Sequence, residues 1–124
     1  MIVFDSSALL AFLQGEPGAA LVDGMLRHGG AVSAANWSEV AQKVAARGAS
    51  WPLARSVLLS HGLEIEPVTR VDAETAAVFW ETCPHLSLAD RLCLALADRL
   101  NATAVTADSV WAEAKVGVAV QLAR

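Results

Sequence analysis

Short apolar runs and amphipathic segments alternate along the chain. The runs end at polar or small residues, as buried strands do, whereas apolar positions in the longer segments recur with the helical period of about 3.6 residues. We therefore predict that strands and helices alternate throughout. The predicted strands are residues 2–4, 31–34, 63–68, 102–106 and 116–122, and the predicted helices are 8–13, 19–27, 36–47, 51–60, 72–81 and 88–100, with a short last helix after residue 108.

Polar residues at the helix starts support these boundaries. Ser87 precedes its helix as an N-cap does, and Asp108 stands in the same position before the short helix that contains Trp111. Asn36 and Glu39 have the spacing of a capping box. This spacing predicts that their helix begins at Asn36.

The alternation favours an α/β fold, in which a central, mostly parallel β-sheet is flanked by helices on both faces. A chain of 124 residues without an internal repeat or linker predicts a single domain, residues 1–124. No apolar run approaches the roughly 20 residues that span a bilayer, and the N-terminus lacks the basic region and cleavage site of a signal peptide. We expect a cytoplasmic protein that does not associate with membranes.

Composition and charge narrow the function classes. Hydrophobic residues make up 55% of the chain, which is high for a small protein with a polar surface, so we expect a partner or a second copy to cover part of it. The net charge of −4 argues against a protein that passively coats nucleic acid. The negative charge does not exclude a nuclease, because a metal ion can neutralise an acidic active site and a few arginines can hold the phosphates. The candidate arginines are Arg47, Arg55, Arg70, Arg91 and Arg99.

Four acidic residues stand where an α/β sheet gathers its ligands. Asp5 and Asp108 follow predicted strands, while Glu39 and Asp90 lie in the first turns of predicted helices. Ligands of such sheets bind outside the carboxyl ends of the strands, so we expect the four carboxylates to converge. A pair about 4 Å apart repels by roughly 4 kcal/mol at an effective dielectric of about 20. A cation would offset this repulsion, and oxygen ligands suit Mg²⁺ or Mn²⁺.

The expected roles follow from this chemistry. Asp5 and Asp90 are the expected direct metal ligands, and Asp108 binds the ion directly or through water. Glu39 either ligates the ion or accepts a proton from the attacking water. Each acid also has a structural interpretation: Asp5 and Asp108 as N-caps, Glu39 in a capping box, and Asp90 in a first helical turn.

Two hydroxyl residues stand beside the acids. Ser7 follows Asp5, and Thr106 precedes Asp108. Their hydroxyls either orient the carboxylates or the phosphate, or bond to the local backbone.

The residues around the acids form an ordered set of motifs: VFDSSALL at 3–10, NWSE at 36–39, SLAD at 87–90 and VTAD at 105–108. In order and spacing this set resembles PIN-domain ribonucleases, and the chain length is similar to that of VapC-type toxins of toxin–antitoxin pairs. The resemblance covers essentially the whole chain. Trp111 stands where the family often has phenylalanine or leucine, which looks like a packing change.

The resemblance implies a PIN-like domain and a Mg²⁺- or Mn²⁺-dependent endoribonuclease that hydrolyses RNA phosphodiester bonds. It makes Asp5, Glu39, Asp90 and Asp108 catalytic, with Asp5, Asp90 and Asp108 holding the metal. It also implies inhibition by a cognate VapB-type antitoxin and, usually, a homodimer.

Two other classes of function remain open. A non-catalytic PIN-like module would bind RNA or protein only, although such a module is free to lose its acids. A Mg²⁺-binding receiver needs a lysine at the end of a late strand, but neither Lys43 nor Lys115 ends a predicted strand. A haloacid-dehalogenase phosphatase needs a second aspartate two residues after Asp5, where Ser7 stands.

The remaining side chains of interest have mainly structural interpretations. Cys83 and Cys93 fit no zinc pattern and are expected to be buried thiols or incidental. The four tryptophans are expected in the core or at an interface, with Trp37 also a candidate for stacking on a base. His85 is a candidate RNA contact, and Asp98 is expected to be a surface charge. An antitoxin helix is expected to dock in a groove formed by Val40, Val44, Val57, Leu58, Leu9, Leu10, Phe12 and Leu13.

Overall fold

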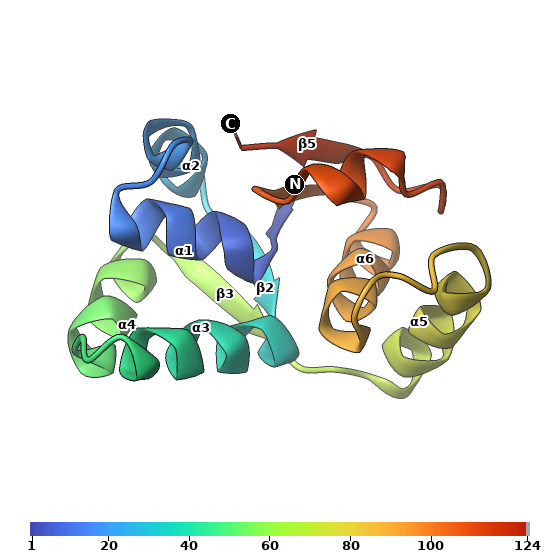
Figure 1. Ribbon diagram of the computed structural model, residues 1–124, viewed down its shortest axis with the longest axis horizontal. Helices are drawn as coiled ribbons and strands as arrows, with labels where there is room; N and C mark the ends of the chain where they lie inside the picture. Colours follow the sequence, from blue (N-terminus) through green and yellow to red (C-terminus); the bar gives the residue numbers. More distant parts are fainter. Residues whose placement is uncertain (124) are drawn as a thin grey trace.

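A computed structural model describes residues 1–123. Its centre is a five-stranded sheet in the order β3-β2-β1-β4-β5, and all the neighbouring strands are parallel. Figure 1 shows this sheet between two groups of helices. The strands are β1 (Ile2–Phe4), β2 (Gly30–Ser33), β3 (Leu63–Glu66), β4 (Thr103–Thr106) and β5 (Val120–Leu122).

Six α-helices and one 3₁₀ helix connect the strands in the described part of the chain. This confirms the predicted α/β fold, in which helices flank both faces of a parallel sheet. The helices are α1 (Ser6–Gln14), α2 (Ala19–Leu26), α3 (Ala34–Ala46), α4 (Trp51–Ser60), α5 (Arg70–Thr82), α6 (Leu88–Leu100) and the 3₁₀ helix η1 (Ser109–Glu113).

Successive strand residues point to opposite faces of the sheet, as the pleat requires. Val3 belongs to the core beneath one face, and its neighbour Phe4 belongs to the core beneath the other. Ala104 and Val105 divide in the same way on the adjacent strand. Because both faces are covered, these strands read as continuous apolar runs.

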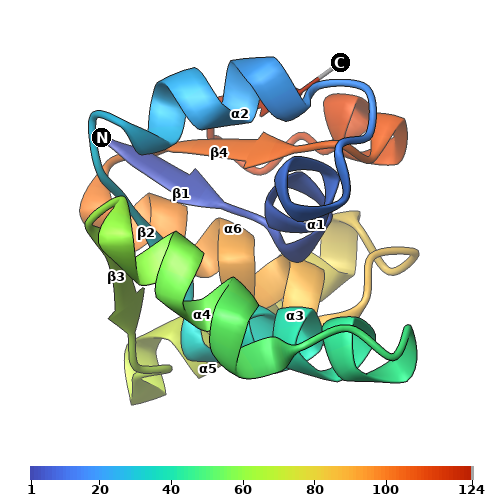
Figure 2. The same cartoon turned by 90° about the vertical axis from the view of Figure 1, so that its left-hand side faces the viewer.

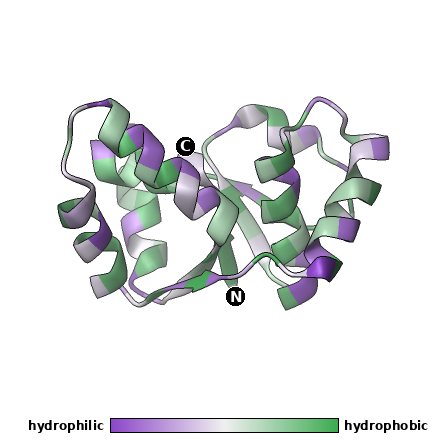
Figure 3. Ribbon diagram, turned by 90° about the horizontal axis from the view of Figure 1, so that it is seen from below, coloured by the Kyte–Doolittle hydropathy of each residue, from purple (hydrophilic) through white to green (hydrophobic). Residues whose placement is uncertain are grey.

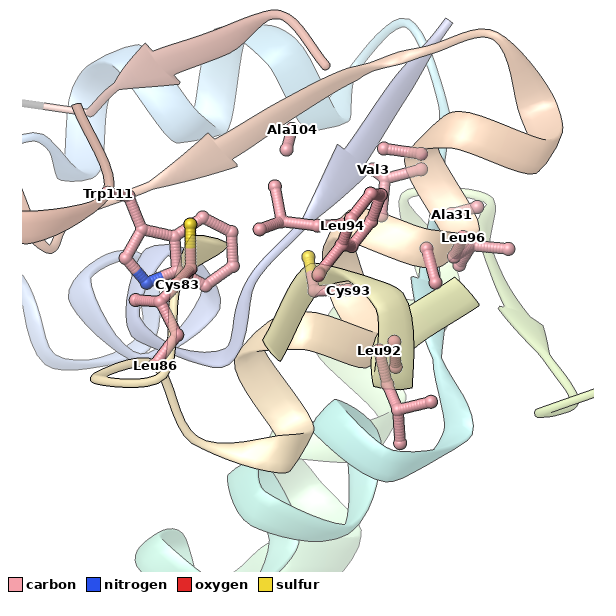
Figure 4. Packing of buried hydrophobic residues seen from close by; sticks show 14 residues of the cluster. Val3, Ala31, Cys83, Leu86, Leu92, Cys93, Leu94, Leu96, Ala104 and Trp111 are labelled. Atoms are coloured by element: carbon pink, nitrogen blue, oxygen red, sulfur yellow. The ribbon is translucent and has the colours of Figure 1, made fainter. Parts of the chain in front are cut away.

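The first core lies between the sheet and the pair α5 and α6 (Figure 4). Residues 92–97 of α6 are all buried, so this helix passes through the interior rather than over the surface. Trp111 of η1 is fully buried and closes one end of the core, which confirms a packing role for it. Cys83 and Cys93 are free and buried in the same cluster, as expected.

The second core lies beneath the opposite face and is covered by α1, α2, α3 and α4. Leu9, Val22, Val40 and Leu58 are completely buried, one from each of these helices. Gly30 of β2 permits this packing, because a Cβ atom there would lie 2.6 Å from Cε2 of Phe4. Burial of this apolar surface is the main favourable term in folding.

Several predicted boundaries need correction. The third helix begins at Ala34 rather than Asn36, because Ser33 ends β2 and caps α3 directly, accepting from the backbone N–H of Ala35 at 3.2 Å. The last strand is only Val120–Leu122, because only these residues pair with β4, opposite Ala104 to Thr106. The expected strand at 63–68 likewise ends at Glu66.

The groove expected for a helical partner is largely core. Most of its expected lining is buried, namely Leu9, Leu10, Val40, Val44 and Leu58. Val57 is 36% exposed and Leu53 of the same helix is 67% exposed. These two side chains, together with Leu13 and Ala54, line a smaller hollow of about 500 Å³ beside the ends of α1 and α3.

Apolar side chains also remain on the outside of α5. Val71, Val78 and Trp80 are all more than half exposed. Figure 3 shows hydrophobic and hydrophilic residues, green and purple, alternating along the helices. Among the described helices, none is long and apolar enough to cross a membrane.

The strand order distinguishes one position in the sheet, between β1 and β4. The chain moves outward from β1 to β2 and β3, and then returns to the other side of β1 to form β4 and β5. Between β1 and β4 the direction of winding therefore reverses. Ligands of doubly wound sheets bind beyond the carboxyl ends of the strands at such a point.

Candidate active site

Asp5 lies at this point, directly after β1. Its backbone N–H continues the pairing with β4 by donating to the Val105 carbonyl at 2.9 Å. Although Asp5 occupies the N-cap position of α1, its carboxylate forms no capping hydrogen bond within the described residues. The simple N-cap interpretation of Asp5 is therefore wrong, and the carboxylate is available for another role.

Two hydroxyls hold the Asp5 carboxylate, one from the first turn of α1 and one from the end of β4. Ser7 Oγ donates to Asp5 Oδ2 at 2.6 Å, and Thr106 Oγ1 donates to the same oxygen at 2.9 Å. Each hydroxyl in turn accepts a backbone N–H, Ser7 from Ala107 at 3.0 Å and Thr106 from Asp108 at 3.1 Å. The hydroxyls therefore join the end of β1 to the end of β4. Asp5 Oδ1 receives only a long contact of 3.5 Å from Ser6 Oγ, which leaves it free for a cation.

Burial dominates the electrostatics of Asp5, which is only 2% exposed. Burial raises the pKa of Asp5 to about 6 in spite of the hydrogen bonds from Ser7 and Thr106, and the negative charge of Asp90 adds to the increase. A carboxylate that is held by donors but penalised for its charge is stabilised by a nearby cation. Asp5 thus fits a metal ligand better than a structural acid.

Asp90 approaches from the other side of the sheet, in the first turn of α6. It forms a capping box with Ser87, in which Asp90 N–H donates to Ser87 Oγ at 3.1 Å and Ser87 N–H donates to Asp90 Oδ2 at 3.3 Å. Burial raises the pKa of Asp90 despite these bonds, and the charges of Glu39 and Asp108 raise it further. The capping role is therefore real, but it does not account for the other acids around Asp90.

Asn36 positions the Glu39 carboxylate, although the sequence pattern assigned Asn36 to the start of a helix as part of a capping box. Asn36 lies inside α3 and is fully buried, and its Nδ2 donates to Glu39 Oε1 at 3.1 Å and to the Ala89 carbonyl at 3.3 Å. Since Ala89 precedes Asp90, this one amide ties the glutamate of α3 to the start of α6. Asn36 Oδ1 is buried without a hydrogen-bond partner among the described residues.

Asp108 lies two residues beyond β4 and caps η1 by accepting the Val110 N–H at 3.0 Å. Its N-cap interpretation is therefore correct. Its charge nevertheless contributes to the raised pKa of Asp90. Capping uses Oδ1 of Asp108, so Oδ2 remains available.

The four acids share one electrostatic environment at the carboxyl edge of the sheet. Asp90 senses Glu39 and Asp108, and Asp5 senses Asp90. They do not, however, form a closed set of ligands: within residues 1–123, no group of three or more His, Cys, Asp or Glu side chains is compact enough to hold a metal ion. Mutual repulsion favours such spreading of like charges.

The donor set fits a hard divalent cation. All four side chains offer carboxylate oxygens, and two of them lie in environments that raise their pKa. Mg²⁺ and Mn²⁺ prefer such oxygens and bind through a few carboxylates while keeping several waters. Asp5, Asp90 and Asp108 would hold the ion, with Glu39 beside it, once their side chains move closer together than they stand here.

The wall beneath the acids is apolar. Cys93 on α6 is completely buried, and burial, together with the charges of Asp5, Asp90 and Glu39, raises the pKa of its thiol well above the ordinary value. The thiol therefore remains protonated and offers no ligand at neutral pH. It contributes packing next to the acidic edge.

Several other candidates have structural partners instead. Arg91 Nη1 donates to the Ala76 carbonyl at 2.8 Å, and Arg99 forms an ion pair with Asp72 at 2.8 Å. Trp37 packs edge-to-face on Trp51 with ring centroids 4.9 Å apart. Arg91 and Arg99 thus connect α6 to α5. Because their guanidinium groups have these partners within the protein, less supports a role for them in binding RNA.

Three candidates lie at the surface. Asp98 is exposed on α6, as expected of a surface charge, and His85 is exposed in the loop before that helix. Trp80 is 56% exposed on α5.

Sequence reasoning missed the role of Asn36 in holding Glu39. The signal for this role is weak in the sequence, because its other partner, Ala89, lies 53 residues away.

A family model described as PIN domain matches residues 2–117. Three solved structures show the similarity of fold. A toxin–antitoxin complex from Klebsiella pneumoniae has a TM-score of 0.79 at 20% identity, covering 100% of this chain and 98% of that chain. The VapBC2 complex from Rickettsia felis, bound to a DNA fragment from its promoter, has a TM-score of 0.76 at 16% identity, with 98% of each chain covered.

The third is VapC20 from Mycobacterium tuberculosis, a toxin that cleaves the sarcin–ricin loop. It has a TM-score of 0.67 at 18% identity, covering 90% of this chain and 93% of that chain. At such identities the similarity shows the fold alone. Among curated proteins, none is significantly similar in sequence.

Proposed function

The chain belongs to the PIN-domain family, and on this basis we propose that it is a Mg²⁺- or Mn²⁺-dependent endoribonuclease, the toxin of a toxin–antitoxin pair. The observation that carries the proposal is the convergence of Asp5, Glu39, Asp90 and Asp108 from four separate segments on the carboxyl edge of one sheet. Capping explains Asp90 and Asp108 singly. It does not explain why Asp5 is buried beside them without capping.

Each residue has a part in this chemistry. Asp5, Asp90 and Asp108 would hold the metal, and Ser7 and Thr106 fix the orientation of Asp5 through one of its oxygens. When bound, a divalent ion offsets the carboxylate repulsion and polarises the scissile phosphate.

Glu39 completes the site. Asn36 holds one oxygen of Glu39, so the other oxygen accepts a proton from the attacking water.

Cleavage of RNA tests this proposal directly. A panel of structured RNAs is incubated with Mg²⁺, with Mn²⁺ and with a chelator, using the wild type, Asp5→Asn and Asp90→Asn. Asp98→Asn is the matched control, because Asp98 is an exposed acid on the same helix as Asp90. We expect metal-dependent cleavage by the wild type and the control, and a loss of at least about 100-fold in the two site variants. Cleavage that survives chelation would exclude the metal mechanism.

The second partner in this proposal is a cognate VapB-type antitoxin. Two of the structures of similar fold are complexes of a toxin with its antitoxin. The hollow lined by Leu13, Leu53 and Val57 offers an apolar surface for the antitoxin's helix. Leu53→Glu should weaken the complex at least tenfold by calorimetry, whereas Arg55→Glu on the same helix should not.

We also propose a homodimer. The exposed apolar side chains Val71, Val78 and Trp80 of α5 support it, because a monomer gains nothing from exposing them together. Sedimentation at micromolar concentration measures the state, and a monomer there would contradict the proposal.

The open spacing of the acids favours one alternative, a non-catalytic PIN module that binds RNA or protein. Binding of RNA without metal-dependent cleavage in the assay above would identify it. The receiver and phosphatase alternatives lose their basis, because the family model covers almost the whole chain.

A further inference from the structure

A cleft of about 610 Å³ leads away from the acidic edge between α1 and α3. Ser7, Leu10 and Gln14 line it from α1, and their spacing of three and four residues makes them one face of that helix. Asp108 lines the same cleft. The cleft is therefore continuous with the site that holds Asp5. Figures 1 and 2 show α1 and α3 on the same side of the sheet, where the two helices pack together.

The opposite wall of the cleft is basic. Lys43 and Ala46 of α3 and its C-cap residue Arg47 line it from one face. Lys43 and Arg47 are exposed, and within the described residues neither forms an ion pair. Two unpaired cations on one cleft wall are notable in a chain with a net charge of −4.

The basic residues are in line with the catalytic glutamate. Glu39, Lys43 and Arg47 follow one another at four-residue intervals and so share a side of α3. At about 1.5 Å rise per residue, Arg47 lies about 12 Å along the helix from Glu39. That length corresponds to a few nucleotides of a stacked strand.

We propose that this cleft is the path of the RNA backbone leaving the active site, with Lys43 and Arg47 binding successive phosphates. The proposal rests on the proposed ribonuclease function and adds the residues that position its substrate. The apolar lining residues Leu10, Ala11 and Ala46 accommodate sugar and base faces, while the cations meet the phosphates.

Local charge also explains how an acidic protein holds a polyanion. The four site acids repel RNA, so affinity has to come from cations near them. Lys43 and Arg47 supply this attraction on one side of the site only. Glu16, which follows α1 and also lines the cleft, repels the phosphates and so favours a strand held against α3.

A helix-dipole role is the competing explanation, because Lys43 lies in the last turn of α3 and Arg47 is its C-cap. Such a role affects stability and leaves RNA binding unchanged. The two explanations therefore predict different measurements.

The test uses the full chain with Lys43→Gln and Arg47→Gln combined. The control combines Arg27→Gln and Lys115→Gln, which remove the same charge, also from one arginine and one lysine, at exposed positions that do not line the cleft. Binding of an unstructured RNA of about 12 nucleotides is followed by fluorescence anisotropy in chelator across a salt series. Cleavage in Mg²⁺ gives kcat and KM for each variant, and melting temperatures verify folding.

We expect the cleft variant to bind RNA roughly tenfold more weakly at low salt and to lose about 1.4 from the slope of log affinity against log salt, as two phosphate contacts require. Its KM should rise by a similar factor while kcat stays near that of the wild type. The control should match the wild type in all these quantities.

Equal binding and equal salt slopes in wild type and cleft variant would overturn the proposal, and would leave the cleft to another ligand such as an acidic peptide. Binding that depends on Lys43 and Arg47 without any cleavage would uphold it while refuting the nuclease. Metal-dependent cleavage whose kcat and KM are the same in the wild type and the cleft variant would refute the proposed path of the RNA and uphold the nuclease.

Discussion

Asp5 is the one buried acid among the four. Its surroundings disfavour an ionised carboxylate without a counter-ion and so favour a bound cation beside it. Two hydroxyls hold one oxygen, and little holds the other. Sequence position predicted that Asp5 would follow a strand. It did not reveal that Ser7 and Thr106 bond to the same oxygen, because Thr106 is 101 residues away.

Replacing Asp5 tests the cost of its burial. Because the pKa of Asp5 in the fold, about 6, lies above the ordinary 3.8, the protonated carboxyl favours the folded state below pH 3.8, and this contribution is lost as pH rises through about 6. The difference corresponds to roughly 3 kcal/mol. In chelator at pH 8, Asp5→Asn should therefore unfold with a free energy up to about 3 kcal/mol higher than the wild type.

Urea unfolding at pH 5 and pH 8 measures this effect, and the advantage of Asp5→Asn should shrink at the lower pH. Asp98→Asn serves as the control and should change stability little at either pH, because its carboxylate is exposed. An Asp5→Asn protein that is less stable than the wild type at pH 8 would contradict the assigned burial cost.

Asn36 offers a second prediction at this scale. Asn36→Ala removes the donors to Glu39 and to the Ala89 carbonyl, so it should cost about 1–2 kcal/mol of stability. It should also lower kcat at least tenfold, since Glu39 is no longer positioned.

Denaturation and steady-state cleavage measure the two effects of Asn36→Ala, and RNA affinity in chelator should stay unchanged. An unchanged kcat would show that Asn36 only supports the fold.

The elements of this fold were largely predictable from the sequence. Helix α6, for example, begins at Leu88 after Ser87 and ends at Leu100, because its cap and its period agree. Helix α3 was misplaced because Asn36 and Glu39 imitate a capping box, while Ser33 at the end of β2 is the real cap. The length of β5 was overestimated because pairing with β4, which is a tertiary constraint, decides it.

The pairing of α5 with α6 depends on an ion pair. Arg99 donates to both oxygens of Asp72, which is almost completely buried. Burial raises the pKa of Asp72, but the hydrogen bonds from Arg99 and Thr69 and the guanidinium charge outweigh it and hold the pKa below 3.8. The stabilisation is thus present above about pH 4 and is lost as pH falls through the depressed pKa.

Arg99→Met should cost about 2 kcal/mol at pH 7, between the values for exposed and buried pairs. The difference from the wild type should disappear in acid, where Asp72 is protonated. Chemical denaturation over a pH series measures this. Arg55→Met, an exposed arginine without an ion pair in the described chain, is the control. A deficit that persists in acid would show that packing of the arginine stem, rather than charge, is lost.

At the scale of the whole molecule, the strand order explains why distant residues meet. The reversal between β1 and β4 brings Asp5 and Asp108 together, and α3 and α6 add Glu39 and Asp90 from opposite faces of the sheet. The sequence predicted that all four acids lie near this edge because each follows a strand or opens a helix, whereas their meeting around one ion stays a prediction. It could not predict the cleft with Lys43 and Arg47, which exists only where α1 packs against α3.

Partners also belong to this scale. The apolar composition predicted surface for a second molecule, and the structure leaves Leu53 on α4 and Trp80 on α5 exposed. One surface suits an antitoxin and the other a second copy of the chain. The homodimer, the antitoxin, the RNA substrate and the cytoplasmic location remain predictions.

The most direct test of the account is the effect of a divalent ion on melting temperature. At pH 8, a hundredfold excess of Mn²⁺ over its dissociation constant stabilises a protein by about 2.7 kcal/mol, or roughly 10 °C for a chain of this size. We predict this increase for the wild type and for Asp98→Asn, and its loss in Asp5→Asn and Asp90→Asn. A melting temperature that is indifferent to millimolar Mn²⁺ and Mg²⁺, or one that rises equally in all four proteins, would contradict a metal site formed by the converging carboxylates.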